Sequence, residues 1–230
     1  MNVKGLRAAA LLLAVIFGTW AGLWVYSSRP QARPTAPTPP AVVQVPVGEA
    51  SPPGPSDLDE SVIPPPTIPD RLPDFSLPDR TGKPTPIAAW RGKSLIINFW
   101  ATWCAPCRKE IPLLQAVDRE WHGRDVEVIG IAVDFPDKMR AFADELKITY
   151  PLLVGEEDAL DAARSFGMAT PVFPFTVFTD RQGDVVALYI GELHRAQIDL
   201  ILSVVQNLNQ GKVHLPDARR LIAEGLHSLR

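Results

Sequence analysis

The segment Asn98-Phe-Trp-Ala-Thr-Trp-Cys-Ala-Pro-Cys-Arg-Lys-Glu110 contains both cysteines of this 230-residue chain, Cys104 and Cys107. Before them, residues 94–99 form an apolar run typical of a buried strand in a parallel sheet. After Cys104, residues 105–121 carry apolar side chains at helical spacing. The cysteines are therefore predicted at a strand-to-helix junction, where residues three apart on a helix lie about 5 to 6 Å apart and can form a disulfide.

Each cysteine is expected to have its own role. Cys104 precedes the predicted helix, where unpaired N–H groups and the helix dipole stabilise a thiolate, so it is the candidate nucleophile. Cys107 lies one turn into the helix and is the candidate resolving thiol, which attacks a mixed disulfide at Cys104. An exchange of this kind needs no cofactor.

Other uses of two cysteines fit the sequence less well. A zinc site needs two further ligands, and the Cys-x-x-Cys-His spacing of haem attachment is missing. A structural disulfide across a four-residue loop would add little stability, because the gain grows with loop length. No metal is therefore expected, and the four histidines are scattered along the chain: His122, His194, His214 and His227.

The composition excludes further classes of protein. With 23 Lys and Arg against 26 Asp and Glu, the net charge is −3 and there is no basic run, so nucleic-acid binding is disfavoured. Of the 24 prolines, 13 lie between Pro30 and Pro69. That stretch lacks aromatic residues and apolar periodicity, so it is predicted to be a disordered, Pro-rich tether.

The N-terminus carries an almost uninterrupted apolar run from Ala8 to Tyr26, flanked by Lys4, Arg7 and Arg29. As a helix rising 1.5 Å per residue, this run is about 28 Å long, close to the thickness of the bilayer core. It predicts one transmembrane helix, kept as an anchor. The alternative is a cleaved signal peptide.

The chain is thus divided into four parts: a membrane anchor at 1–28, a flexible linker at 29–70, a folded domain at 71–210 and a helical extension at 211–230. The extension is expected to pack on the domain, with contact to a partner as the alternative.

Within the folded part, strands alternate with helices and a hairpin follows, which predicts an α/β sandwich with a mixed sheet. The expected strands are 73–77, 86–89, 94–99, 126–133, 150–154, 175–179 and 185–190, and the expected helices are 105–121, 136–146, 156–166, 195–207 and 216–229.

The segment from Asn98 to Glu110 resembles the active-site segment of the thioredoxin superfamily, and in detail that of the membrane-anchored TlpA/ResA/CcmG-type thiol-disulfide oxidoreductases. The resemblance extends over about Pro73 to Asn207, with Asp79-x-x-Gly82-Lys83 and Thr179-Asp-Arg-Gln-Gly183 among the matching motifs. It implies a thioredoxin-like three-layer sandwich, in which helices flank a central mixed β-sheet.

The same resemblance implies a third catalytic residue. Glu110 matches the acidic residue that the TlpA/ResA group places near the thiols, which implies that it accepts the proton of Cys107. The alternative is a glutamate on the helix surface, paired with a basic neighbour. Thioredoxins proper carry a buried acid in the preceding strand, where this chain has Asn98 instead.

Thioredoxin folds also place a cis-proline opposite the disulfide, where it guides an extended substrate. The register of residues 175–179 places it at Pro174, with Pro171 as the alternative. Phe173 makes this rim more apolar than the usual family pattern. Trp103 is expected to cover the exposed sulfur, with core packing as the alternative, and Pro106 completes the expected substrate-binding set.

These features predict a membrane-anchored enzyme that reduces a disulfide in a client protein, of the cytochrome c maturation or metal-site assembly type. The resemblance implies a membrane electron donor of the DsbD/CcdA type and a catalytic domain on the periplasmic side of the cell inner membrane. Residues 8–26 would contact the lipid bilayer, and a monomer is expected. Three alternatives stay open: a disulfide oxidant, which would have a midpoint potential above about −150 mV, a non-catalytic binding module and a peroxidase.

Overall fold

The computed structural model describes residues 68–121 and 123–229. The predicted membrane span and nearly all of the predicted linker lie outside these residues, so both stay predictions. Among the helices that the model describes, none is long and apolar enough to cross a membrane.

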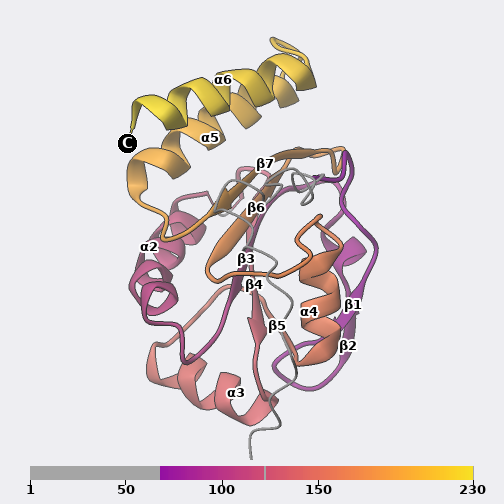
Figure 1. Cartoon of the computed structure of the whole chain (residues 1–230), viewed down its shortest axis with the longest axis vertical. Helices are drawn as coiled ribbons and strands as arrows, with labels where there is room; N and C mark the ends of the chain where they lie inside the picture. The colour runs from indigo at the N-terminus through magenta and orange to yellow at the C-terminus, as the bar shows by residue number, and fades with distance from the viewer. Residues whose placement is uncertain (1–67, 122, 230) are drawn as a thin grey trace, which may run out of the picture. The chain divides into compact units, whose positions relative to one another are not determined.

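The described chain contains two short strands, a 3-10 turn and then alternating strands and helices (Figure 1). The elements are β1 (Ser76–Pro78), β2 (Pro84–Pro86), η1 (Ile87–Trp90), β3 (Ser94–Trp100), α2 (Ala105–Trp121), β4 (Val126–Val133), α3 (Pro136–Glu145), β5 (Leu152–Gly155), α4 (Glu157–Arg164), β6 (Phe175–Thr179), β7 (Val185–Ile190), α5 (Arg195–Asn209) and α6 (Leu215–Ser228).

Five strands form a mixed sheet in the order β5-β4-β3-β6-β7. The strands β3, β4 and β5 run parallel, whereas β6 is antiparallel to both β3 and β7. Residue Phe99 near the end of β3 lies opposite Phe175 at the start of β6. The end of β3, which precedes Cys104, and the start of β6, which follows Pro174, therefore meet at one edge of the sheet.

Side chains of the sheet alternate between its two faces, as the two-residue period of a strand requires. On β3, Ile96 and Trp100 pack in one core with buried residues of α2, α3, α5 and α6. The intervening Ile97 and Phe99 pack in a second core with α4, η1 and β1. Helices thus cover both faces of the sheet, and the chain has the expected thioredoxin-like α/β fold (Figure 1).

Most predicted elements are confirmed, but the strand expected over residues 86–89 is wrong. The strand lies earlier in the chain: β2 spans Pro84–Pro86 and pairs with Ser76–Pro78 of β1. The N–H of Ile87 still donates to the carbonyl of Phe75 at 3.0 Å. The chain then turns into η1, which places the Ile87 side chain in the core at 1% exposure.

The C-terminal helix α6 packs on the domain, as expected. Its residues Ala218 and Ile222 are buried among side chains of α5 and β7. Gly225 allows a close approach to α5, because a Cβ atom built on it would lie 2.6 Å from a methyl carbon of Leu200.

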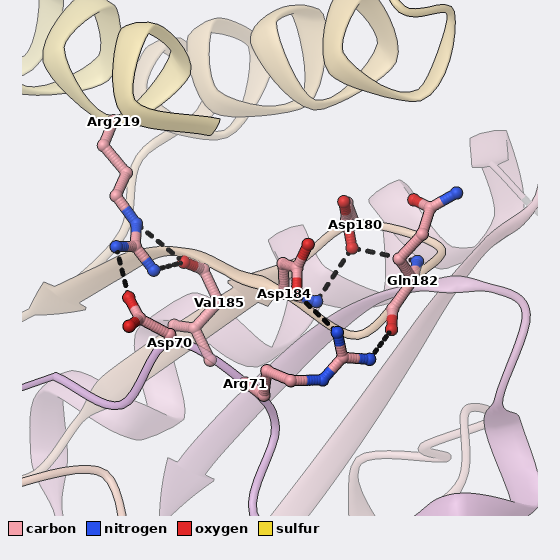
Figure 2. Close-up of polar contacts among 7 residues, drawn as sticks. All are labelled: Asp70, Arg71, Asp180, Gln182, Asp184, Val185 and Arg219. Carbon is pink, nitrogen blue, oxygen red and sulfur yellow. Dashed lines mark hydrogen bonds and ion pairs between the residues drawn. The ribbon is translucent and has the colours of Figure 1, made fainter. Parts of the chain in front are cut away.

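Arg219 fastens α6 to the edge of the sheet (Figure 2). Its Nε and Nη2 atoms donate to the carbonyl of Val185 at 3.0 and 2.7 Å, and its Nη1 atom donates to Asp70 at 2.8 Å. The Val185 N–H in turn donates to the carbonyl of Asp70 at 2.8 Å. One side chain therefore holds the helix, the start of β7 and the first described residues together.

A second set of contacts fixes the turn between β6 and β7 (Figure 2). Asp180 accepts hydrogen bonds from the N–H groups of Gln182 and Asp184 at 2.9 and 2.8 Å, and Gly183 takes a φ of 81°, which favours glycine. Arg71 donates to the Asp184 carboxylate and to the Gln182 carbonyl. Because β6 runs antiparallel to β3, this turn lies at the end of the sheet opposite the cysteines.

We expect Arg219→Ala to lower the free energy of unfolding by about 1 to 2 kcal/mol, because it leaves the carbonyl of the buried residue Val185 without its side-chain donor. The matched control is Arg220→Ala, whose side chain is 63% exposed and pairs with Asp217 on the surface. That change should alter stability by about 0.5 kcal/mol or less. Urea unfolding of both oxidised variants tests the role of Arg219, and equal losses would contradict it.

Candidate functional site

The two cysteines form a disulfide at the junction between β3 and α2, with their Cα atoms 5.3 Å apart. Cys104 is 5% exposed and Cys107 is fully buried. The N–H of Cys107 points to the Cys104 sulfur at 3.3 Å. A donor at a helix N-terminus favours the anionic form of a sulfur, so this geometry suits a thiolate at Cys104 when the disulfide opens.

The bend before Cys104 is held by Asp134, which follows β4. Its buried carboxylate accepts hydrogen bonds from the N–H of Thr102 at 3.2 Å, from the Thr102 hydroxyl and from the N–H of Phe135 at 2.8 Å. Asp134 is not among the site residues predicted from the sequence. The sequence does contain a signal for Asp134: an acidic residue comes directly after a buried parallel strand, at the sheet edge that carries the cysteines.

Glu110 lies inside the protein at 1% exposure, so the alternative of a glutamate on the helix surface is wrong. The side-chain amide of Asn98 on β3 donates to one carboxylate oxygen at 2.7 Å, and the N–H of Leu193 donates to the other at 2.9 Å. The Asn98 amide also donates to the Thr176 hydroxyl on β6 at 3.0 Å. Glu110 is thus fixed between α2, the sheet and the loop before α5.

Burial raises the pKa of Glu110 from 4.5 to about 7, because the charged form loses its water. The hydrogen bonds from Leu193 and Asn98 oppose this rise, and the nearby Glu192 carboxylate adds to it. A carboxyl group with a pKa near neutrality can both accept and return a proton under physiological conditions. Glu110 lies three residues after Cys107, and therefore on the same face of α2.

The buried phenol of Tyr150 adds a further constraint. Its hydroxyl has no hydrogen-bond partner among the described residues. Burial raises its pKa, and the Glu110 carboxylate raises it further. Tyr150 therefore stays neutral at physiological pH and carries no charge that acts on Glu110.

The rim of the site is aromatic. Trp103 is 69% exposed, so core packing of this residue is excluded, and its ring meets that of Phe173 edge-to-face at 6.2 Å. The Phe173–Pro174 peptide bond is cis, which is the position expected from the register of β6, so the alternative at Pro171 is wrong. Pro106 is half-buried in the first turn of α2.

Two further apolar side chains at this edge of the sheet are exposed and were not predicted from the sequence. Phe135, directly after Asp134, is 50% exposed, and Val172, next to Phe173, is 49% exposed. Exposed apolar groups close to a reactive pair are typical of a surface that contacts another protein. Within residues 68–121 and 123–229, no cluster of His, Cys, Asp or Glu could hold a metal ion.

The raised pKa of Glu110 predicts how stability depends on pH. Between pH 4.5 and about 7 the unfolded chain has lost this proton while the folded protein retains it, so the free energy of unfolding falls as the pH rises. The fall amounts to at most about 3 kcal/mol and levels off above pH 7. Glu110→Gln should remove it.

Urea unfolding of the oxidised protein at pH 5 and pH 8 measures this dependence without titrating thiols. Glu120→Gln is the control, since Glu120 lies on the same helix but pairs with Arg195 on the surface. Equal pH dependence in the wild type and in Glu110→Gln would contradict the assignment.

Comparison with known proteins supports the same chemistry. The model of the AhpC/TSA family matches residues 68–189, more than half of the chain. The thioredoxin-like protein YneN of Bacillus subtilis is 29% identical over 135 residues, covering 56% of this chain and 75% of YneN. The thiol-disulfide oxidoreductase ResA of Geobacillus kaustophilus is 28% identical over 135 residues, covering 58% of this chain and 75% of ResA.

Solved structures of thiol:disulfide interchange proteins are also similar to this chain. A thiol:disulfide interchange protein of the thioredoxin family from Chlorobium tepidum TLS is 30% identical with a TM-score of 0.54, over 60% of this chain and 97% of that one. A putative thiol:disulfide interchange protein DsbE from Chlorobium tepidum also has a TM-score of 0.54, over 60% and 98% of the two chains. At 22% identity, the second likeness shows the fold alone.

Proposed function

This chain belongs to the AhpC/TSA family, and we propose that it reduces disulfides in client proteins through Cys104 and Cys107. The class of reaction is that of a thiol-disulfide oxidoreductase, as in its relatives. The observation that carries the proposal is the position of Glu110, whose buried carboxyl group titrates near neutral pH one helical turn from Cys107.

The reaction begins with the reduced pair. The Cys104 thiolate attacks one sulfur of the client disulfide, which forms a mixed disulfide and releases the other client sulfur as a thiolate. Glu110 takes the proton of Cys107, and the Cys107 thiolate attacks the Cys104 sulfur. The second client thiolate leaves, and the Cys104–Cys107 disulfide remains. The two electrons come from the dithiol, and an external thiol donor must restore it.

The buried position of Cys107 explains why a local base is needed. A fully buried thiol has no bulk water to accept its proton, and burial in apolar surroundings disfavours the thiolate. Glu110 lies in the same buried layer and can accept this proton. The carboxyl group returns the proton to solvent or to a leaving thiolate when the cycle ends.

We assign the selection of clients to the aromatic rim, which includes Trp103 and Phe173. Trp103 directly precedes Cys104, its ring meets that of Phe173, and Phe173 is joined to Pro174 by the cis peptide bond, while Pro106 lies in the first turn of α2. An extended client segment would lie along this rim. The exposed apolar side chains favour a client that carries apolar residues beside its cysteine.

We place the enzyme at the cell inner membrane, held by residues 8–26, with its catalytic domain on the periplasmic side. The apolar N-terminal run and the resemblance of the active-site segment to membrane-anchored oxidoreductases support this placement. By the same analogy, a membrane protein of the DsbD/CcdA type would return electrons to the pair. The clients would belong to cytochrome c maturation or metal-site assembly.

The proposal predicts that Cys107→Ser traps clients. This variant should accumulate mixed disulfides through Cys104, because the resolving thiol is missing, and the doubly substituted Cys104→Ser/Cys107→Ser control should accumulate none. Non-reducing gels of periplasmic extract incubated with the reduced variant measure this. The absence of adducts would instead indicate a non-catalytic binding module.

A further inference from the structure

Two neighbouring contacts join α2 to the loop between β7 and α5. The inner contact is the hydrogen bond from the Leu193 N–H to Glu110 at 2.9 Å. The outer contact joins the adjacent residues, Lys109 and Glu192, whose charged atoms lie 3.9 Å apart. The side chains of Lys109 and Glu192 are 70% and 28% exposed. The outer pair is therefore in contact with solvent, and each of its residues is next in sequence to a residue of the inner contact.

The outer pair contributes little to stability by itself, since exposed ion pairs at such distances rarely do. The Glu192 carboxylate nevertheless acts on Glu110, whose pKa it raises. A negative charge at Glu192 disfavours a second negative charge at Glu110, and a positive charge at Lys109 favours it. Burial strengthens such interactions, because the medium around Glu110 is less polarisable than water.

We propose that Glu192 and Lys109 are a pair of positioning residues that set, in opposite directions, the pH at which Glu110 accepts the proton of Cys107. Glu192 adds to the effect of burial in favouring the protonated form of the Glu110 carboxyl group, and Lys109 limits this contribution. The inference rests on the proposed function, in which Glu110 receives that proton.

The following groups around Glu110 are neutral in the oxidised protein, so they do not compete with Glu192 and Lys109 in setting its charge. Asn98 on β3 and Thr176 on β6 are neutral hydrogen-bonding groups. Tyr150, before β5, stays protonated for the reasons given above. Cys104 and Cys107 do not titrate while they form a disulfide.

The test measures the titration of Glu110 itself in the oxidised protein. Carbon-13 labelling of the glutamate carboxyl groups gives an NMR signal for each, and Glu110→Gln identifies the signal of Glu110. We expect Glu192→Gln to lower the midpoint of this titration by about half a pH unit, and Lys109→Gln to raise it by about half a unit or less.

Opposite shifts distinguish a charge effect from a structural one. Both substitutions break the same ion pair, so loss of a merely structural contact would move the midpoint in the same direction in both variants. The matched control is the neighbouring pair of Arg108 and Glu145, whose charged atoms lie 3.8 Å apart. Arg108→Gln and Glu145→Gln should shift the midpoint by less than about 0.2 units.

Shifts in the same direction, or shifts no larger than those of the control pair, would overturn the proposal. Because the oxidised protein carries out no turnover, this result is independent of client trapping by Cys107→Ser. Trapped clients without opposite shifts would contradict the role of the ion pair alone. Opposite shifts without trapped clients would contradict the proposed function.

Discussion

The hydrogen bonds to one buried carboxyl group connect the parts of this site. Glu110 is tied to β3 through Asn98, to β6 through the bond from Asn98 to Thr176, and to the loop before α5 through the N–H of Leu193. A buried carboxyl group is unfavourable unless it is hydrogen-bonded or protonated. The contacts that tie Glu110 to the sheet and to the loop before α5 therefore also oppose the rise in its pKa that burial causes.

The packing around this carboxyl group keeps it away from water. Trp100 and Tyr150 approach β4 closely, because Gly130 has no side chain: a Cβ atom there would lie 3.0 Å from an atom of each ring. The result is an aromatic wall on the α2 face of the sheet, with Glu110 and Cys107 in the same buried layer. The proposed function thus depends on a buried carboxyl group whose ionisation lowers the free energy of unfolding. The packing of the two hydrophobic cores compensates for that loss of stability.

Much of this arrangement could be predicted from the sequence, because its signals are local. Apolar periodicity indicated β3, β4 and α2, and the spacing of Cys104 and Cys107 indicated the disulfide. The contacts that could not be predicted join residues far apart in the chain. Asp134 binds Thr102, 32 residues earlier, and Leu193 binds Glu110, 83 residues earlier. Such pairs depend on the order of strands in the sheet, which a single sequence does not specify residue by residue.

The central claim, that Glu110 accepts the proton of Cys107, is tested most directly by the step in which Cys107 acts. When the reduced protein reacts with an aromatic disulfide such as dithiobis-nitrobenzoate, Cys104 releases the first coloured thiolate and Cys107 releases the second. Stopped-flow measurement of the second release across pH 5 to 9 isolates this step. The account predicts that its rate in the wild type rises with a midpoint near pH 7, and that Glu110→Gln slows the step and moves the midpoint toward that of an unassisted thiol, about 8.5 or above. Identical rates and pH profiles in the two proteins would contradict it.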